Sequence, residues 1–280
     1  MSVRKVLVTG VGGFLGARVA AFFSEKGYEV AGLAHSELDI SDPEAVMTRF
    51  KATMPDAVIH CAAISDTGYS QQHPHESYKV NVEGSVNIAT ACAAVGAKLI
   101  YMSSDQVYGG CKTEGPLPES LDLSPNGVYG QHKLLAEQKI SAILPSAVGL
   151  RLTWMYDRPS SRNVGMKMNR NIFVSMEASA AEGRTMKACT LEHRGLTNVW
   201  DVIANIERCL DIPGGVYNFG CGNDLDSYET YSRLAGMLGY PASMVIPDDS
   251  WSRNLAMDCS RLNAVGIYFP TTIDSLKEMA

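Results

Sequence analysis

The residue types best suited to chemistry in this 280-residue chain are one tyrosine, one lysine and one serine. Tyr129 and Lys133 are four positions apart, so on a helix their side chains project from the same face. A phenol has a reference pKa of about 10, which makes it a poor acid or base at neutral pH. A neighbouring ammonium lowers that pKa and thereby tunes the phenol for general acid–base catalysis. Ser104 follows a strand pattern over 98–103 and adds a hydroxyl at the predicted sheet edge.

A glycine-rich stretch over 10–16 leads into a helical pattern over 17–26. Gly10, Gly13 and Gly16 are spaced by three residues and directly follow an apolar run. A strand that enters a helix through such a turn needs a residue that tolerates positive φ, which is glycine. The N-terminus of the helix then offers unpaired N–H groups to a pyrophosphate. The stretch therefore predicts dinucleotide binding, with a tight structural turn as the alternative.

Strand and helix patterns alternate along the first half of the chain. Five stretches predict strands buried in a sheet: 5–8, 28–33, 57–63, 98–103 and 147–152. Four stretches between them predict helices: 17–26, 43–50, 76–95 and 129–143. Asp42 is the predicted N-cap of the second helix, with Pro43 at its first position. This alternation predicts an α/β fold, a doubly wound parallel sheet that holds its ligands at the carboxyl ends of the strands.

The second half of the chain is less regular. A polar loop and a lone helix follow the fifth strand, and a helix-then-strand pattern returns over 199–220. We therefore predict that residues 1–152 and 194–220 form the dinucleotide-binding domain. The remainder, 153–193 and 221–280, is expected to form a smaller C-terminal α/β substrate-binding domain.

Composition excludes several classes of function. Apolar residues make up 46% of the chain and charged residues 19%, which is typical of a globular enzyme. The net charge of −6 argues against nucleic acid as a partner. No apolar run is long enough to span a membrane, and the early first strand leaves no room for a signal peptide. Seven scattered cysteines without a CxxC pair indicate free thiols, no metal site and a cytoplasmic protein.

Together the glycine triplet, Ser104 and the pair Tyr129 and Lys133 resemble an extended short-chain dehydrogenase/reductase. Four further stretches are similar to dTDP-4-dehydrorhamnose reductases: 38–40, 103–108, 151–156 and 258–262. The similarity runs through most of the chain and is loosest in the predicted substrate domain. It implies a Rossmann-type fold and the NAD(P)H-dependent reduction of a nucleotide-linked 4-keto-6-deoxy sugar.

The resemblance also implies a role for each catalytic residue. Tyr129 protonates the carbonyl oxygen while a hydride reaches the carbon, and Ser104 orients that oxygen. Lys133 holds the nicotinamide ribose and lowers the pKa of the tyrosine. Asn81 matches a fourth catalytic position, which holds a water in the proton relay. The superfamily further implies a homodimer through the helix that carries Tyr129.

The predicted binding residues lie at the ends of the predicted strands. The expected cofactor contacts are Gly10, Gly13, Phe14, Leu15, Gly16, His35, Ser36, Asp39, Ile40, Cys61, Ala62, Ala63, Tyr129 and Lys133. Within this set, the resemblance places Asp39 and Ile40 at the adenine. The expected substrate contacts are Ser104, Asp105, Gln106 and Trp154, and the segment with Thr197 and Asp201 borders the site.

The residues after the second predicted strand bear on the choice of cofactor. A carboxylate at that point would hydrogen-bond the adenosine ribose and favour NAD. Residues 33–36 contain none, whereas His35 and Ser36 suit a 2′-phosphate and Arg18 is placed to assist. The sequence therefore favours NADP(H), with NAD(H) as the alternative.

The residues beside Ser104 help to distinguish reduction from the other reactions that this superfamily catalyses. Nucleotide-sugar 4,6-dehydratases carry an Asp–Glu pair there because loss of water needs a carboxyl acid–base. Here Gln106 follows Asp105, and an amide cannot shuttle a proton, so dehydration is disfavoured. A 4-epimerase or another sugar reductase shares Ser104, Tyr129 and Lys133 and stays an alternative. A non-catalytic NAD(P)-binding regulatory subunit is the third reading, because these reductases resemble the regulatory subunit of methionine adenosyltransferase.

Structural roles for the same residues also stay open. Taken alone, Tyr129 fits a core tyrosine with Lys133 as a solvated neighbour, and Trp154 fits either the core or a substrate wall. Their joint occurrence at the family spacing favours the catalytic interpretation over the structural one.

Overall fold

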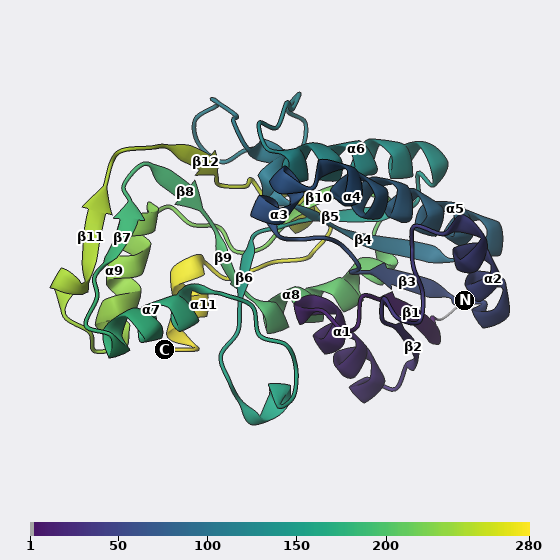
Figure 1. The fold of residues 1–280 in the computed structure, drawn as a ribbon, viewed down its shortest axis with the longest axis horizontal. Helices are drawn as coiled ribbons and strands as arrows, with labels where there is room; N and C mark the ends of the chain where they lie inside the picture. Colours follow the sequence, from purple (N-terminus) through teal and green to yellow (C-terminus); the bar gives the residue numbers. More distant parts are fainter. Residues whose placement is uncertain (1–2) are drawn as a thin grey trace.

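The computed structural model describes residues 3–280, and its centre is a six-stranded sheet in which every strand pair is parallel. The strand order is β10-β5-β4-β3-β1-β2 (Figure 1). The six strands are β1 (Lys5–Thr9), β2 (Glu29–Leu33), β3 (Ala57–His60), β4 (Lys98–Ser104), β5 (Val148–Leu152) and β10 (Gly215–Phe219). The chain runs outward from β1 in both directions, which creates a switch point between β1 and β3 where such sheets bind ligands. The predicted α/β Rossmann-type fold is confirmed.

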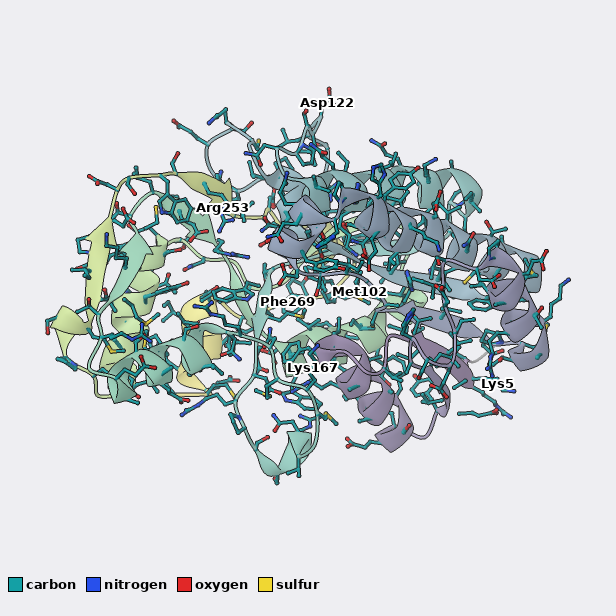
Figure 2. The ribbon with its side chains drawn as sticks, in the orientation of Figure 1. Lys5, Met102, Asp122, Lys167, Arg253 and Phe269 are labelled. Atoms are coloured by element: carbon teal, nitrogen blue, oxygen red, sulfur yellow. The ribbon has the colours of Figure 1, made fainter. Side chains whose placement is uncertain are left out.

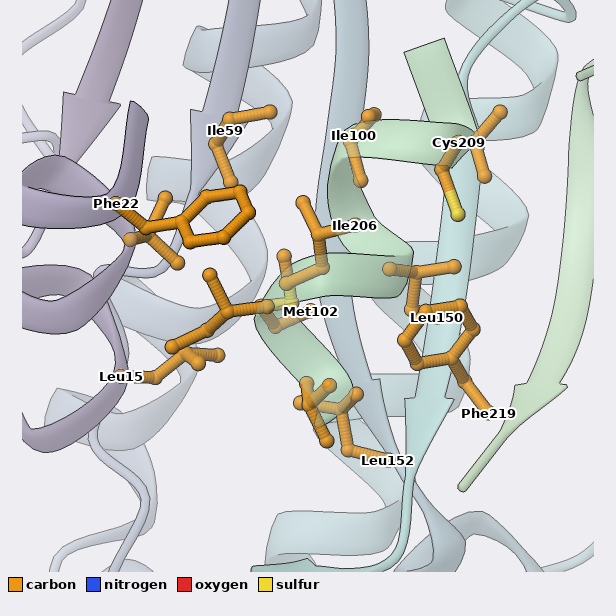
Figure 3. Packing of buried hydrophobic residues seen from close by; sticks show 14 of the residues in the cluster. Leu15, Phe22, Ile59, Ile100, Met102, Leu150, Leu152, Ile206, Cys209 and Phe219 are labelled. Carbon is orange, nitrogen blue, oxygen red and sulfur yellow. The ribbon is translucent and has the colours of Figure 1, made fainter. Parts of the chain in front are cut away.

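Helices cover both faces of this sheet, as Figure 1 shows. One layer consists of α2 (Pro43–Thr53), α5 (Ser85–Val95) and α6 (Val128–Ile143), and the other of α1 (Phe14–Glu25) and α8 (Val199–Arg208). Figure 3 shows how the layer of α1 and α8 meets the sheet: Phe22 of α1 and Ile206 of α8 pack against Ile100 and Leu150. Burying each such side chain contributes about 1.5–3 kcal/mol, so these contacts fix both helices on the sheet.

The start of α2 shows how local sequence fixes the helix ends. The Asp42 side chain accepts hydrogen bonds from the N–H groups of Glu44 and Ala45, both at 3.0 Å. Pro43 occupies the first helical position, where its missing N–H removes no hydrogen bond. The predicted N-cap is therefore confirmed.

The long helix predicted over 76–95 is instead divided. The structure has α3 (Thr67–Gln72), which was not predicted, then α4 (Pro74–Tyr78) and a π-helical turn (Lys79–Gly84) before α5. Asn81 lies in this turn and is fully buried. Its Oδ1 accepts the N–H of Ile64 at 2.8 Å, and its Nδ2 donates to the Ile64 carbonyl at 2.9 Å. The π-turn thus holds Asn81 against the loop that follows β3.

A smaller lobe lies at one end of the sheet, on the left in Figure 1. Its helices are α7 (Ile172–Ala181), α9 (Ser227–Met237) and α11 (Thr272–Lys277), whereas α10 (Ser260–Ala264) packs against β10 of the main sheet. Its strands form three parallel pairs: β7 (Met186–Cys189) with β11 (Val245–Asp248), β8 (Glu192–Arg194) with β12 (Arg253–Leu255), and β6 (Trp154–Tyr156) with β9 (Leu196–Asn198). These strands were not predicted, because segments of three or four residues show no readable alternation.

The division of the chain into two domains stays our proposal. The chain leaves the main sheet after β5 and returns to it through α8 and β10. We propose that residues 1–152 and 194–220 form one domain, whose first two residues lie outside the described part, and that 153–193 and 221–280 form the other. This boundary cuts through β8, so Arg194 and β9 pair with strands of the smaller lobe although the division counts them with the first domain.

Membrane-spanning helices, metal clusters and disulfide bonds were each considered from the sequence, and the structure gives one observation on each. Within residues 3–280, no helix is both long and apolar enough to cross a membrane. The same residues contain no group of three or more His, Cys, Asp or Glu side chains arranged to hold a metal ion. All seven cysteines are free thiols.

Candidate active site

A cavity of about 570 Å³ lies where β1, β2 and β3 end. Its walls come from the three loops that follow these strands, at the switch point of the sheet. Nine of the predicted cofactor residues line it: Gly10, Gly13, His35, Ser36, Asp39, Ile40, Cys61, Ala62 and Ala63. Its volume is in the range of small-molecule and cofactor sites.

The glycine turn fits close approach by a dinucleotide. Gly10 has φ +73°, and a Cβ there would lie 2.7 Å from the backbone N of Ala62. Gly13 is the N-cap of α1 and has no side-chain cap, so the first N–H groups of the helix stay free for an anion. The Leu15 side chain packs into the core and Phe14 lies under Arg18, so both are available to a cofactor through their backbone. The residues present therefore fit a pyrophosphate.

Gly16 is expected to tolerate no side chain. A Cβ at this position would overlap the carbonyl oxygen of Gly10, which forces the turn apart. We expect Gly16→Ala to destabilise the fold by about 1–3 kcal/mol and to weaken NAD(P)H binding by at least about tenfold. Fluorescence titration of the reduced cofactor and urea unfolding measure both effects.

The matched control is Gly236→Ala, because Gly236 is an exposed glycine inside α9 with no atom near an added Cβ. That change is expected to leave cofactor binding intact and to stabilise by about 0.5–1 kcal/mol. Equal cofactor affinity in the two variants would contradict the role given to Gly16.

Asp39 lines the cavity beside His35 and Ser36, and a second carboxylate, Glu37, lies in the same turn without lining the cavity. Asp39 Oδ1 accepts the Oγ of Ser41 at 2.7 Å and its N–H at 2.9 Å, and these two bonds lower the pKa of Asp39. Glu37 Oε2 accepts the N–H of Ala34 at 2.8 Å, which folds this exposed carboxylate back onto the turn after β2. The sequence analysis missed Glu37, although its position three residues beyond an Ala in a tight turn is a readable signal.

Arg18 is not available to a 2′-phosphate, so that expectation was wrong. Its side chain is completely buried, and Nε pairs with Asp157 Oδ2 at 2.8 Å. Its Nη1 donates to the carbonyls of Phe14 at 2.7 Å and Lys167 at 3.0 Å. Figure 2 labels Lys167 in the loop beside α1. A buried guanidinium needs several acceptors, and those of Arg18 lie both on α1 and in the loop after β6. Arg18 therefore holds this loop against the first helix.

Three of the four predicted catalytic side chains, those of Ser104, Tyr129 and Lys133, come together beside the cavity. Tyr129 and Lys133 lie on α6, and the Lys133 Nζ is 5.7 Å from the centroid of the Tyr129 ring. Lys133 Nζ also donates to the carbonyl of Met102 on β4 at 2.9 Å, which brings the helix to the end of the strand that carries Ser104. Figure 2 shows Met102 in the middle of the molecule. All three side chains are buried.

The pKa of Tyr129 shifts in the opposite direction to the one predicted. Burial raises the pKa of the phenol and the Asp105 carboxylate raises it further, while the nearby Ser104 hydroxyl acts the other way. The prediction of a lowered pKa was wrong because burial and the Asp105 carboxylate both favour the neutral phenol, and no lowering by Lys133 is found. Burial also lowers the pKa of Lys133 to about 8.

Cys61 connects the cavity to this group. It lines the cavity, and it is close enough to Lys133 for each of the two groups to influence the pKa of the other. Burial raises the pKa of the Cys61 thiol to about 12, so it is a neutral wall residue at physiological pH. Lys133 therefore lies close to the wall that Cys61 forms, although neither Lys133 nor Tyr129 lines the cavity itself.

Asp105 and Gln106 lie beside Ser104 and share one hydrogen-bond cluster. Asp105 Oδ1 accepts Ser104 Oγ at 3.2 Å and Gln106 Nε2 at 3.1 Å. Asp105 Oδ2 pairs with Arg194 Nη2 at 2.7 Å. The Arg194 Cζ lies 5.4 Å from the Trp154 ring centroid, which draws Trp154 into the same cluster. Arg194 was not singled out from the sequence, because a three-residue strand such as β8 leaves no pattern that marks its side chains.

Two further predicted residues lie apart from this cluster. Thr197 Oγ1 bonds Thr153 Oγ1 at 2.6 Å, and Asp201 Oδ2 accepts Ser275 Oγ at 3.4 Å. Both side chains hold the junction between the main sheet and the smaller lobe. Their place at the border of the site stays a prediction.

Comparisons with known proteins show which family this chain resembles. Residues 4–242 match the model of the family described as RmlD substrate binding domain. The dTDP-4-dehydrorhamnose reductase of Mycolicibacterium smegmatis is 37% identical over 55% of this chain and 46% of its own length, so the matched stretch spans about half of that relative. Methionine adenosyltransferase 2 subunit beta of Xenopus laevis is 30% identical over 94% of this chain and 83% of its own.

A solved structure shares the whole fold. The dTDP-4-dehydrorhamnose reductase of Bacillus anthracis, solved in complex with NADP, superposes with a TM-score of 0.87 at 22% identity, covering 99% of this chain and 98% of its own. The family match extends from β1 through the Arg194 segment to α9 and so includes every residue of the site described above. The chain therefore belongs to the RmlD substrate binding domain family.

Proposed function

We propose that the protein is an oxidoreductase that reduces the keto group of a nucleotide-linked 4-keto-6-deoxy sugar with NADP(H) or NAD(H). The observation that carries this proposal is the buried group Ser104, Tyr129 and Lys133 beside a cavity built on a glycine turn. The names of the mycobacterial relatives support a dTDP-4-dehydrorhamnose reductase-like activity.

Each side chain then has a defined task. A bound reduced nicotinamide supplies the hydride. Tyr129 donates the proton to the carbonyl oxygen, and its raised pKa keeps the phenol protonated for this step. Ser104 donates a hydrogen bond to the same oxygen, and Lys133 holds the ribose hydroxyls. Asn81, clamped against Ile64, holds the loop after β3 in place beneath the cofactor.

The sugar is expected to lie where the two lobes meet. Asp105, Gln106 and Trp154 surround this region together with Arg194. The Trp154 ring offers an apolar face to a 6-deoxy sugar, while the carboxylate and the amide offer polar contacts to its hydroxyls.

A second candidate is a cofactor-binding regulatory subunit. It is favoured by the 30% identity to a methionine adenosyltransferase subunit over 94% of this chain. A 4-epimerase is a third, because it uses the same three catalytic side chains. Both differ from the reductase in one measurable respect, since neither consumes reduced cofactor in a net reaction.

The test is to mix the protein with NADPH or NADH and a dTDP-4-keto-6-deoxy sugar and to follow the absorbance of the reduced nicotinamide. Stoichiometric oxidation with formation of a deoxy sugar supports the reductase. Cofactor binding without oxidation, in the presence of this sugar, overturns it. NMR identifies the 4-hydroxyl product of the reduction, and a separate incubation with NAD⁺ and a nucleotide sugar that carries a 4-hydroxyl tests for inversion at that position.

Glu37 is predicted to influence the choice between the two cofactors. Its carboxylate lies in the turn next to His35 and Ser36, where it would repel a 2′-phosphate and accept a hydrogen bond from a ribose hydroxyl. We expect Glu37→Gln to raise kcat/KM for NADPH relative to NADH by about fivefold, which corresponds to about 1 kcal/mol at an exposed site. Glutamine still accepts the N–H of Ala34, so the turn is kept.

The control for this change is Glu25→Gln, an exposed carboxylate at the end of α1. That variant has the same change of net charge away from the cavity and is expected to leave the cofactor ratio unchanged. If both variants shift the ratio equally, Glu37 has no specific role in cofactor choice.

A further inference from the structure

The Asp105 carboxylate is buried and uses both of its oxygens. Oδ2 pairs with Arg194 from the smaller lobe at 2.7 Å, and Oδ1 accepts from Gln106 at 3.1 Å and Ser104 at 3.2 Å. Only 3% of the Asp105 side chain and 13% of the Arg194 side chain are exposed. A carboxylate this deeply buried needs a cation and full hydrogen bonding to stay charged. Arg194 is the cation that meets this need.

The Ser104 hydroxyl has a single proton, which in this state goes to Asp105. Its oxygen meanwhile accepts the N–H of Gln106 at 3.2 Å. To orient a substrate carbonyl, Ser104 must turn that proton away from the carboxylate and toward the substrate. An unpaired carboxylate accepts a hydrogen bond far more strongly than a neutral ketone does, so it would keep the proton.

We propose that Arg194 is a positioning residue that, together with Gln106, holds the Asp105 carboxylate so that Ser104 is free to donate to the substrate carbonyl. This inference rests on the proposed reductase function. The glutamine after Asp105 supports it, since an amide donates to the carboxylate where a second carboxylate would repel it. The smaller lobe thus contributes to the chemical step through a contact that never touches the reacting atoms.

The contact geometry sets the test. Arg194 reaches Asp105 through one nitrogen, Nη2, while its Nε is buried and has no hydrogen-bond partner. A lysine ammonium can replace a single contact of this kind, whereas methionine keeps the apolar stem and removes the charge. The two substitutions therefore separate the charge of residue 194 from its packing.

We expect Arg194→Met to lower kcat by about ten- to a hundredfold, because it removes the benefit of one hydrogen bond to the carbonyl oxygen. The KM for the sugar and the cofactor Kd are expected to change by less than about threefold, a free-energy change below about 1 kcal/mol. Arg194→Lys is expected to recover most of kcat. The double variant Arg194→Met with Asp105→Asn is expected to recover much of it as well, since no carboxylate then competes for the Ser104 proton.

The matched control is Arg253→Met. Arg253 pairs with Glu192, so the variant breaks a neighbouring ion pair between β12 and β8 without reaching Ser104. An equal fall in kcat for Arg253→Met, or failure of both the lysine and the double variant to recover activity, overturns the positioning role. Unchanged kcat in Arg194→Met also overturns it. A wild-type protein that reduces no keto sugar overturns the proposed function itself, which keeps the two failures distinct.

Discussion

Replacing Tyr129 by phenylalanine is expected to lower kcat for sugar reduction by about 10²–10⁴-fold, the usual worth of a positioned general acid. The ring stays, so the contact with Lys133 and the wall of the site are kept. Because only the proton donor is removed, the Kd for NADPH or NADH is expected to stay within about twofold of the wild-type value. Stopped-flow oxidation of the reduced cofactor and a separate fluorescence titration give the two quantities.

The raised pKa of Tyr129 determines the sign of the pH dependence. A phenol that titrates above its ordinary range is protonated throughout the neutral range, so reduction does not lose its acid as the pH rises through neutrality. In the reverse direction the phenolate is the active form, and the rate of alcohol oxidation is expected to increase with pH. A decline of the reverse rate with rising pH would contradict the assignment of Tyr129.

Tyr217→Phe is the control for this substitution. Tyr217 lies on β10, away from the site. The change removes its hydroxyl, which donates a hydrogen bond to the carbonyl of Pro213 at 3.0 Å. This variant is expected to retain wild-type kcat. If Tyr129→Phe kept more than about a tenth of the activity, a different group would have to supply the proton.

Replacing Glu137 by glutamine is expected to lower the free energy of unfolding by about 3–5 kcal/mol, because it leaves a buried guanidinium without its counter-charge. Glu137 and Arg151 are each at least 95% buried, and their side chains meet at 2.7 Å and 3.0 Å. Arg151 continues to the Tyr108 hydroxyl at 2.8 Å, and Ser103 donates to Glu137. Urea unfolding of the cofactor-free protein measures the loss.

Two further variants show whether the loss of stability in Glu137→Gln comes from the unpaired buried charge. Replacing both Glu137 and Arg151 by methionine removes both charges and is expected to recover most of the stability, because burying an ion pair has little net benefit. Asp274→Asn breaks the pair between Asp274 and Lys277, whose side chains are both 58% exposed, and is expected to cost less than about 1 kcal/mol. A similar cost for Glu137→Gln would show that the buried network contributes little.

The position of this network explains why stability and geometry are linked in this protein. Glu137 is one helical turn beyond Lys133 on α6, and Ser103 directly precedes Ser104 on β4. The same buried charges therefore fix the helix that carries Tyr129 against the strand that carries Ser104. The catalytic side chains are held by groups that face away from the substrate.

The main sheet and its cofactor loop could be predicted because their signals are local. The strand β1 is a continuous apolar run, and the close packing at Gly10 and Gly16 leaves room for glycine alone. The pair Tyr129 and Lys133 could be predicted from helical spacing. In each case a few neighbouring residues contain both the structural constraint and the chemistry.

What the sequence did not reveal depends on contacts between distant residues. Arg194 meets Asp105 across 89 positions and Arg18 meets Asp157 across 139, so neither pairing leaves a local pattern. The direction of the Tyr129 pKa shift depends on burial, which the spacing to Lys133 does not contain. The π-turn around Asn81 looks like ordinary helix in the sequence, because one extra residue in a turn changes no periodicity that a short window can detect.

The position of β10 has a consequence for how this protein is made on the ribosome. This strand pairs with β5 at one edge of the sheet, yet in the chain it comes after β6 to β9 and α7, which together separate it from β5 by more than sixty residues. While the nascent chain is still emerging, β5 is an open edge, and Leu150 lacks the cover that α8 later provides. Translation therefore passes through a long interval in which the nucleotide-binding half is nearly complete but remains a target for chaperones. The sheet has all six of its strands only when Phe219 has left the exit tunnel.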